Sequence, residues 1–125
     1  MQYENNIPIY LQVIRQIKNS IVIGELKPGE KMLSARDLAI KYSINPNTAA
    51  RIYKELEREE VCFTKRGLGT FVTEDTKKLG TIREEMASQL IRNFVEGMEQ
   101  LGFEHQEMIE ILLHRYDNLV SDKKK

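Results

Sequence analysis

Apolar residues recur at helical spacing near the start of the chain. Over residues 8–22 they lie three or four positions apart, which places them on one face of a helix. Pro8 suits the first turn of such a helix, and Gly24 suits the position just after its end. The residues on the apolar face are Tyr10, Val13, Ile14, Ile17, Ile21 and Val22.

A second, shorter helix is predicted over residues 35–42. Ser34 is a good N-cap residue, and Leu33 and Leu38 occupy the two positions of a hydrophobic staple. Asp37 lies in the first turn, where an acidic side chain interacts favourably with the helix dipole. These signals are local, and together they indicate where the helix begins.

The third helix begins at a sharp corner. Asn45 is a good N-cap residue, and Pro46 is a good first residue of a helix. Because a proline disfavours the helical conformation of the residue before it, the second helix cannot continue into the third. On the third helix, the inward face holds Ala49, Ile52, Tyr53 and Leu56, and the opposite face holds Asn47, Arg51, Lys54 and Arg58.

Residues 61–73 change to a strand-like pattern. Two β-prone runs, 61–65 and 70–73, flank the sequence Arg-Gly-Leu-Gly, which is typical of a hairpin with a tight tip. The polar residues 74–79 that follow are interpreted as a linker.

The rest of the chain predicts two long helices, over residues 80–101 and 104–120, with Gly102 ending the first. Each helix has a wide apolar stripe, and a hairpin of two helices cannot cover both stripes by itself. We therefore expect a second copy of the chain to cover them; the alternative is packing onto residues 1–73. The residues expected at the dimer contact are Ile82, Met86, Leu90, Phe94, Met98, Met108, Leu112, Tyr116 and Leu119.

The order of these elements predicts a mainly α-helical fold with a small β-hairpin wing. Three helices with a sharp turn before the third, followed by a hairpin, form a winged helix-turn-helix in residues 1–73. Residues 74–79 link it to a C-terminal α-helical hairpin in residues 80–125.

Composition narrows the function. Of the 125 residues, 41% are hydrophobic and 30% are charged, as in a soluble globular protein. No apolar run approaches the roughly 20 residues of a membrane-spanning helix, and the N-terminus lacks a signal-peptide pattern, so a cytoplasmic protein without a membrane partner is expected. The one cysteine, Cys62, cannot form an internal disulfide.

No pattern of catalytic or metal-binding residues is present in the sequence. His105 and His114 are the only histidines, and we interpret them as solvated surface residues. No catalytic triad, P-loop or cluster of metal ligands accompanies them. We therefore expect no enzyme activity, no metal and no cofactor.

The net charge of zero conceals an uneven distribution. Residues 1–73 contain 11 Lys and Arg against 8 Asp and Glu, whereas residues 74–125 contain 8 against 11. A basic N-terminal half beside an acidic C-terminal half suggests two separate tasks.

The start of the third helix has the chemistry to read DNA. In a helix-turn-helix the second helix lies in the major groove with its N-terminal residues against the base edges. Asn and Thr side chains can donate and accept hydrogen bonds there, and Arg51 can reach a guanine edge or the backbone. The residues expected to contact DNA, including those of the hairpin tip, are Arg36, Asn45, Asn47, Thr48, Arg51, Lys65, Arg66 and Gly67.

Residues 8–72 also resemble the winged helix-turn-helix of GntR-type bacterial transcription regulators. The resemblance rests on Gly24-x-Leu26-x-Pro28-Gly29, Ser34-x-Arg36-x-Leu38-Ala39, Asn45-Pro46-Asn47-Thr48, Tyr53-x-x-Leu56-Glu57 and Gly67-x-Gly69-Thr70-Phe71-Val72. It implies that Arg36, Asn47, Thr48, Arg66 and Gly67 stand where the family contacts DNA.

The sequence departs from the family pattern at four positions. Leu33 replaces a common proline, and Ala49 replaces a usual valine. Ala50 stands where some members have a DNA-contacting arginine, so that this contact is absent or is taken over by Arg51. Glu60 stands where a glycine normally ends the third helix, so we expect that end, and the direction of the wing, to differ.

The short C-terminal part is similar to that of the YtrA-type group, whose two-helix tail dimerises. The resemblance implies a homodimeric repressor that binds a palindromic operator in double-stranded DNA and controls its own operon and a neighbouring transporter operon. It also implies a small-molecule effector, but no set of residues identifies a pocket for it. The sequence leaves open an alternative, in which the C-terminal helices dock another protein and DNA binding is secondary.

Overall fold

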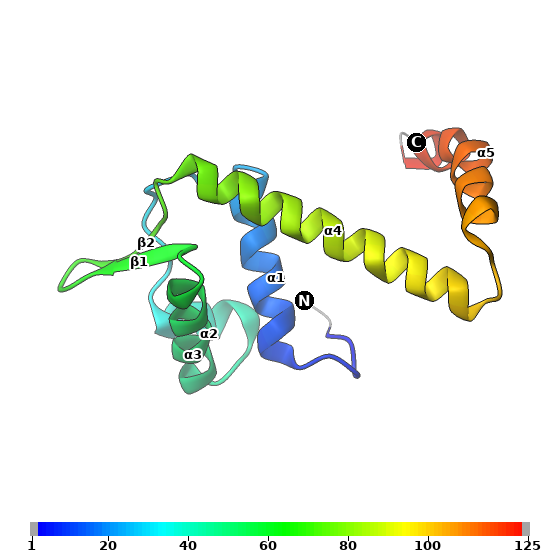
Figure 1. Ribbon diagram of the computed structural model, residues 1–125. Helices are drawn as coiled ribbons and strands as arrows, with labels where there is room; N and C mark the ends of the chain where they lie inside the picture. The colour runs from blue at the N-terminus through cyan, green and yellow to red at the C-terminus, as the bar shows by residue number, and fades with distance from the viewer. Residues whose placement is uncertain (1–2, 124–125) are drawn as a thin grey trace. The chain divides into compact units, whose positions relative to one another are not determined.

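The computed structural model describes residues 3–123. Residues up to Glu84 form one compact unit, and those from Glu85 form a second. The expected mainly helical fold with a two-stranded hairpin and two C-terminal helices is confirmed. The elements are α1 (Ile9–Val22), α2 (Ala35–Tyr42), α3 (Pro46–Arg58), β1 (Cys62–Lys65), β2 (Gly69–Val72), α4 (Thr76–Gln100) and α5 (His105–Lys123) (Figure 1).

The core of the first unit is formed by α1, α2, α3 and the hairpin. Val13, Ile52 and Leu56 are 0% exposed, and so are Val61 and Val72 at the base of the hairpin. The inward faces that the spacing predicts on α1 and α3 are therefore the buried ones, except that Tyr10 and Val22 are only half-buried. This packing fixes the position of α3 against α1 and α2.

One buried polar residue, Gln12, attaches the N-terminal segment to α1. Its side-chain oxygen accepts the Glu4 N–H at 2.9 Å, and its side-chain nitrogen donates to the Glu4 and Ile7 carbonyls at 2.9 and 2.8 Å. These bonds satisfy the amide, as the burial of a polar group requires. The segment is also attached to α2, because the Tyr3 hydroxyl donates to the Tyr42 carbonyl at 2.5 Å.

The corner between α2 and α3 forms as the sequence predicts. Ser34 Oγ accepts the Asp37 N–H at 3.1 Å at the start of α2. Ser43 ends α2 in the left-handed region, with a φ of 55°, and Ile44 donates its N–H back to the Ala39 carbonyl at 3.0 Å. Asn45 then caps α3 and changes the direction of the chain.

The wing, which comprises β1, β2 and the turn between them (residues 62–72), projects from the three helices (Figure 1). Phe63 pairs with Phe71 in the antiparallel register, and their rings stack with centroids 5.8 Å apart. Lys31 forms an isolated bridge to Phe71, and the Met32 N–H donates to the Thr70 carbonyl at 2.7 Å. These contacts hold the base of the wing against the segment that leads into α2.

The end of α3 does not differ as Glu60 led us to expect. Glu60 takes a φ of 61°, the left-handed conformation that a glycine would adopt there. Its N–H donates to the Glu57 carbonyl, and the Val61 N–H donates to the Leu56 carbonyl, both at 2.9 Å. These two bonds and the complete burial of Val61 hold the usual turn despite the unfavourable residue, and the effect of Glu60 on the direction of the wing stays a prediction.

We expect Glu60→Gly to raise the free energy of unfolding by up to about 1 kcal/mol. Glycine removes the strain of a side chain in the left-handed region, although its flexible unfolded state offsets part of the gain. Urea denaturation followed by circular dichroism measures the effect. Glu25→Gly is the control, because Glu25 is exposed and its φ is not positive, so this substitution should lower stability. A Glu60→Gly midpoint at or below that of the wild type would contradict the strain.

The start of α4 corrects the predicted linker. The helix begins at Thr76 rather than Gly80, so most of residues 74–79 are helical. The signal that was missed is Asp75, whose Oδ1 accepts the N–H groups of Lys77 and Lys78 at 3.0 and 3.1 Å as an N-cap. The proposed division into a DNA-binding and a dimerisation domain stays a prediction.

The end of α4 forms as predicted. Gly102 has a φ of 88° and donates its N–H to the Glu99 carbonyl at 2.9 Å, while the Phe103 N–H donates to the Met98 carbonyl at 3.1 Å. This pair of bonds is the Schellman motif, which reverses the chain into α5.

Candidate nucleic-acid interface

The tip of α3, residues 45–51, exposes short polar side chains. Asn47 and Arg51 are exposed and Thr48 is half-buried, whereas the neighbouring Ala49 is 0% exposed. The first turn of α3 contains no acidic residue. The tip therefore offers hydrogen-bonding groups and no negative charge at the positive end of the helix dipole.

Asn45 has a structural task at this tip. Its Oδ1 accepts the Asn47 N–H at 2.7 Å, which is the N-cap bond that starts α3 after the corner. That oxygen already accepts a backbone N–H, and the side-chain amide nitrogen of Asn45 can donate to DNA. The predicted DNA contact by Asn45 stays a prediction.

The acidic residues at the C-terminal end of α3 lie away from its tip, and two of them have basic partners. Glu55 pairs with Arg58, and the bond from the Arg58 guanidinium lowers the pKa of the Glu55 carboxyl. Glu59 accepts a hydrogen bond from Lys18 Nζ at 2.7 Å, which ties the end of α3 to α1. Because these acids lie away from the tip, they do not oppose the approach of phosphate there.

Two buried groups support α3 from within. The Tyr53 hydroxyl donates to the Leu33 carbonyl at 2.5 Å, and burial raises the pKa of Tyr53. Burial, together with the charge of Glu57, raises the pKa of the Cys62 thiol to about 12, so the thiol stays protonated at neutral pH. Both side chains anchor the elements that position the tip.

Two of the residues predicted as basic DNA contacts lie against aromatic rings, and the spacing of residues in the sequence did not predict these pairs. The Arg51 guanidinium carbon is 4.2 Å from the centroid of the Tyr10 ring. Lys65 Nζ lies 5.6 Å from the Phe63 ring and 5.1 Å from the Phe71 ring. Each distance is within the range of a cation–π contact.

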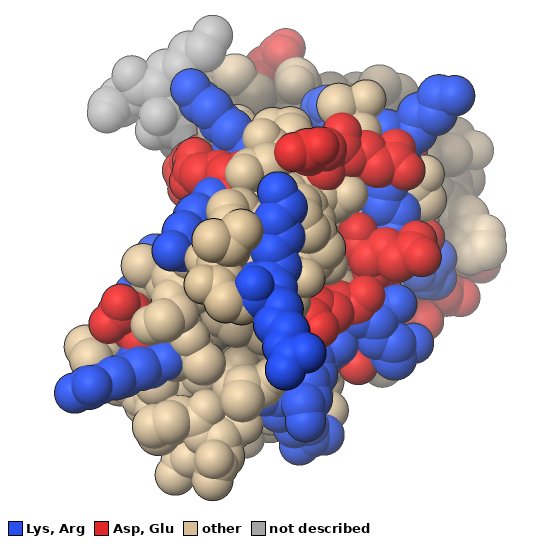
Figure 2. Space-filling model, turned by 90° about the vertical axis from the view of Figure 1, so that its left-hand side faces the viewer, with Lys and Arg blue, Asp and Glu red and all other residues tan. Residues whose placement is uncertain are grey.

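The other predicted DNA contacts are exposed. Arg36 lies in the first turn of α2, and Arg66 and Gly67 form the turn of the wing. Gly67 has a φ of 78°, which the tight turn requires and glycine readily adopts. Figure 2 faces the side of the molecule that carries the wing, and its lower left part shows Lys and Arg among mostly uncharged side chains.

The structure divides the residues predicted for dimerisation. Ile82 and Met108 are only 5% and 3% exposed, so they are buried within the single chain. Helical spacing cannot tell which side of a stripe packs internally, and the predicted dimer contact as a whole stays a prediction. The side chain of Leu119 lies outside the described residues. The others are half-buried (Met86, Phe94 and Met98) or exposed (Leu90, Leu112 and Tyr116).

An exposed apolar stripe runs along α5. Its members are spaced i, i+3, i+4 and i+7, so they lie on one face of the helix. Ile109 and Leu113, which the predicted contact omitted, belong to it. The α5 stripe and its exposed fractions are Ile109 51%, Leu112 48%, Leu113 73% and Tyr116 63%, and Leu90 and Ile91 of α4 are 68% and 62% exposed.

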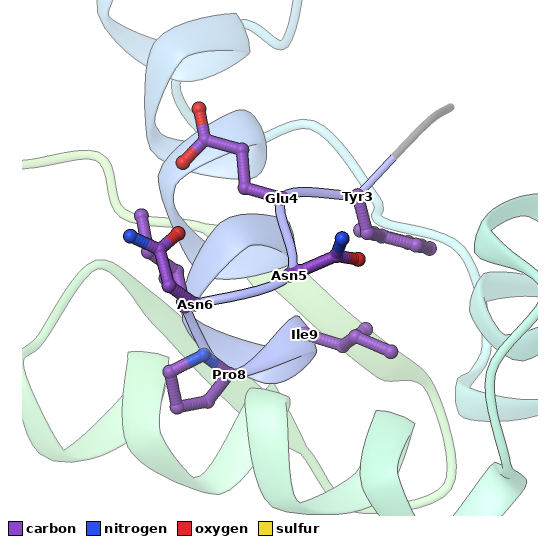
Figure 3. Close-up of a pocket in the computed structure, with 7 residues that line it drawn as sticks. Tyr3, Glu4, Asn5, Asn6, Pro8 and Ile9 are labelled. Carbon is purple, nitrogen blue, oxygen red and sulfur yellow. The ribbon is translucent and has the colours of Figure 1, made fainter.

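The described residues offer little else as a ligand site. An open hollow is lined by seven consecutive residues, Tyr3–Ile9, so a single segment forms it (Figure 3). Within residues 3–123 no group of three or more His, Cys, Asp or Glu side chains is placed to hold a metal ion. Among the same residues, no helix has the length and apolar character needed to cross a membrane.

Comparison with known proteins gives matches along most of the chain. Residues 9–72 match the family described as bacterial regulatory proteins, gntR family. The chain is 38% identical over 109 residues to the uncharacterized HTH-type transcriptional regulator YhcF of Bacillus subtilis, which covers 87% of this chain and 90% of YhcF. It is 41% identical over 98 residues to the HTH-type transcriptional repressor YtrA of the same organism, covering 74% and 75%.

Comparison with solved structures also gives similarity to GntR family regulators and to a DNA-binding domain. A GntR family transcriptional regulator from Listeria monocytogenes matches with a TM-score of 0.80 at 37% identity, covering 90% of this chain and 98% of that one. The DNA-binding domain of AraR in complex with operator ORR3 matches with a TM-score of 0.53 at 25% identity, covering 58% and 88%.

Proposed function

Because the chain belongs to the gntR family of bacterial regulatory proteins, and within it to the YtrA-like group, we propose that it is a homodimeric repressor that binds a two-fold symmetric DNA site. Its family consists of DNA-binding transcription regulators and not of enzymes. The observation that carries the proposal is the capped corner before α3, which presents an exposed, acid-free polar tip.

The tip of α3 would enter the major groove. There Asn47 and Thr48 would hydrogen-bond to base edges, and Arg51 would reach a guanine edge or a phosphate. The wing would lie along the minor groove, with Lys65 and Arg66 near the phosphates and Gly67 allowing the backbone to approach closely. Arg36, at the start of α2, would bind a phosphate.

A second copy of the chain is the proposed occupant of the α5 stripe. The stripe consists of four neighbouring apolar side chains on one helix face, each at least 48% exposed. We expect another protein surface to cover them in the functional protein. A copy of the same chain brings an identical stripe, so the contact closes with two-fold symmetry. This symmetry also matches a palindromic operator. If another protein covered the stripe instead, the chain would be monomeric at micromolar concentration in analytical ultracentrifugation.

The proposed consequence of binding is repression in the cytoplasm. YtrA is named as a repressor, and occupancy of an operator blocks access of the polymerase. The proposed targets, its own operon and a neighbouring transporter operon, follow from the resemblance to that group. A small-molecule effector is part of the same proposal, without an assigned pocket.

Selection of binding sites from a pool of random duplexes tests the proposal. The full-length protein should enrich an inverted repeat whose half-sites are centred one or more helical turns apart. Recovery of no enriched sequence, or of a single unrepeated site, would contradict it.

We expect Arg36→Ala and Arg66→Ala to weaken binding to all duplexes alike. Each removes one phosphate contact per subunit, so the slope of log K against log salt should fall in magnitude by about 2 for the dimer. Fluorescence anisotropy at several salt concentrations measures the slope. Arg92→Ala, at an exposed position of α4, is the control and should leave it unchanged. An unchanged slope for Arg66→Ala would show that Arg66 of the wing does not contact a phosphate.

A further inference from the structure

The contact between Tyr10 and Arg51 joins the first turn of α1 to the tip of α3. The guanidinium carbon lies 4.2 Å from the centroid of the Tyr10 ring. Arg51 is exposed, and Tyr10 is half-buried. Arg51 is also the only Lys or Arg in residues 46–53, so it carries the positive charge of the first two turns of α3.

The backbones on both sides of this contact are fixed by the core. Val13, one turn after Tyr10, is 0% exposed, and so are Ala49 and Ile52 around Arg51. The bond between Lys18 and Glu59, at 2.7 Å, ties the other ends of α1 and α3 together. The position of the ring relative to α3 is therefore set by the packing of the two helices.

With its carbon 4.2 Å over the ring, the guanidinium of Arg51 can lie flat against Tyr10 and keep its hydrogen-bonding capacity. A guanidinium group is planar, and its five N–H donors lie in that plane, so a ring against its face leaves the edge free. A long side chain also loses rotamer freedom when it binds DNA, and this loss is smaller if the side chain is already held. The ring can thus hold the guanidinium while its edge contacts a guanine or a phosphate.

From this geometry we infer that Tyr10 is a positioning residue for Arg51 in DNA recognition. The aromatic ring holds the guanidinium beside the tip of α3, where its in-plane donors face the bound duplex. The inference rests on the proposed function, and it adds a residue of α1 to the determinants of operator affinity.

The test compares Tyr10→Leu and Tyr10→Phe, each in the wild-type and the Arg51→Ala background. Affinity is measured with the full-length protein for the selected site and for an unrelated duplex. Tyr10→Leu should weaken binding to the selected site by roughly 3- to 10-fold. It should change binding to the unrelated duplex by less than about 2-fold, and Tyr10→Phe should bind like the wild type because it keeps the ring. In the Arg51→Ala background, Tyr10→Leu should have no further effect.

Arg51→Lys is a second variant, and it leaves the half-buried Tyr10 unchanged. It keeps the charge but lacks the planar group, so it should lose affinity for the selected site and keep it for the unrelated duplex. Unchanged or tighter binding by Tyr10→Leu would overturn the inference, and so would a Tyr10→Leu loss that persists in the Arg51→Ala background. If the wild type selects no site at all, the proposed function itself fails. If the wild type selects a site but Tyr10→Leu binds it as tightly, only the inference about Tyr10 fails.

Discussion

Leu113→Asp will convert the protein to monomers and weaken binding to its two-fold symmetric site by about 100-fold or more. Leu113 is the most exposed member of the α5 stripe, at 73%. In a dimer its side chain would be desolvated against apolar groups, where a carboxylate is strongly unfavourable. Two linked DNA-binding domains bind about 10²–10⁴-fold more tightly than one, because the second binds intramolecularly. A monomer loses this gain in affinity.

Sedimentation velocity measures the oligomeric state of the variant, and a gel-shift titration measures its affinity for the two-fold symmetric site. Because Leu113 is exposed in the single chain, the substitution should leave the helical circular dichroism spectrum unchanged. Asn118→Asp is the matched control, since it adds the same charge at an exposed position of α5 outside the stripe. A Leu113→Asp variant that remains a dimer with full affinity would show that the α5 stripe is not the contact.

Asn47→Ala will reduce discrimination between the operator and altered sites by about 1–3 kcal/mol, roughly 5- to 150-fold in affinity. Asn47 is exposed at the second position of α3, where side chains of a recognition helix meet base edges. Alanine forms helix well, so the fold should be retained. The expected signature is a loss of preference at one or two base pairs in each half-site.

Binding to a panel of singly substituted operators measures this loss. Asn19→Ala is the control, because Asn19 is exposed and lies far from the tip of α3. It is nine residues after Tyr10 on α1, which is roughly 13 Å along the helix from the residue that contacts Arg51. Asn19→Ala should keep the full base preference. If Asn47→Ala retained the preference at every position, Asn47 would not read the bases.

The parts of the fold that follow from local signals were predictable from the sequence. Ser34, Asn45 and Pro46 start α2 and α3 because caps depend on neighbouring residues alone. Gly102 ends α4 for the same reason. The early start of α4 was also a local signal, in Asp75, but the polar composition of residues 74–79 obscured it. At Glu60 tertiary packing overrode the preference of the residue, and sequence alone does not reveal that balance.

The sequence predicted which residues form the candidate DNA-binding site, but not the contacts that these residues make within the protein. Periodicity placed Asn47 and Arg51 on the exposed face of α3, and the structure agrees. The ring of Tyr10 against Arg51 depends on how α1 crosses α3, which helical spacing does not specify. The same limit applies to Ile82 and Met108, since an apolar stripe does not indicate which partner covers it.

Disulfide trapping tests most directly whether the tip of α3 enters the major groove in two copies. Ala50 is exposed on α3, and Ala50→Cys adds a thiol there, while Cys62 is 3% exposed with a pKa raised to about 12 and should not react. A thiol tether on the N4 atom of cytosine, which projects into the major groove, is moved stepwise along the selected site. We expect cross-links at two positions related by two-fold symmetry, with two protein chains per duplex. Cross-links at no position, or in only one half of a symmetric site, would contradict it.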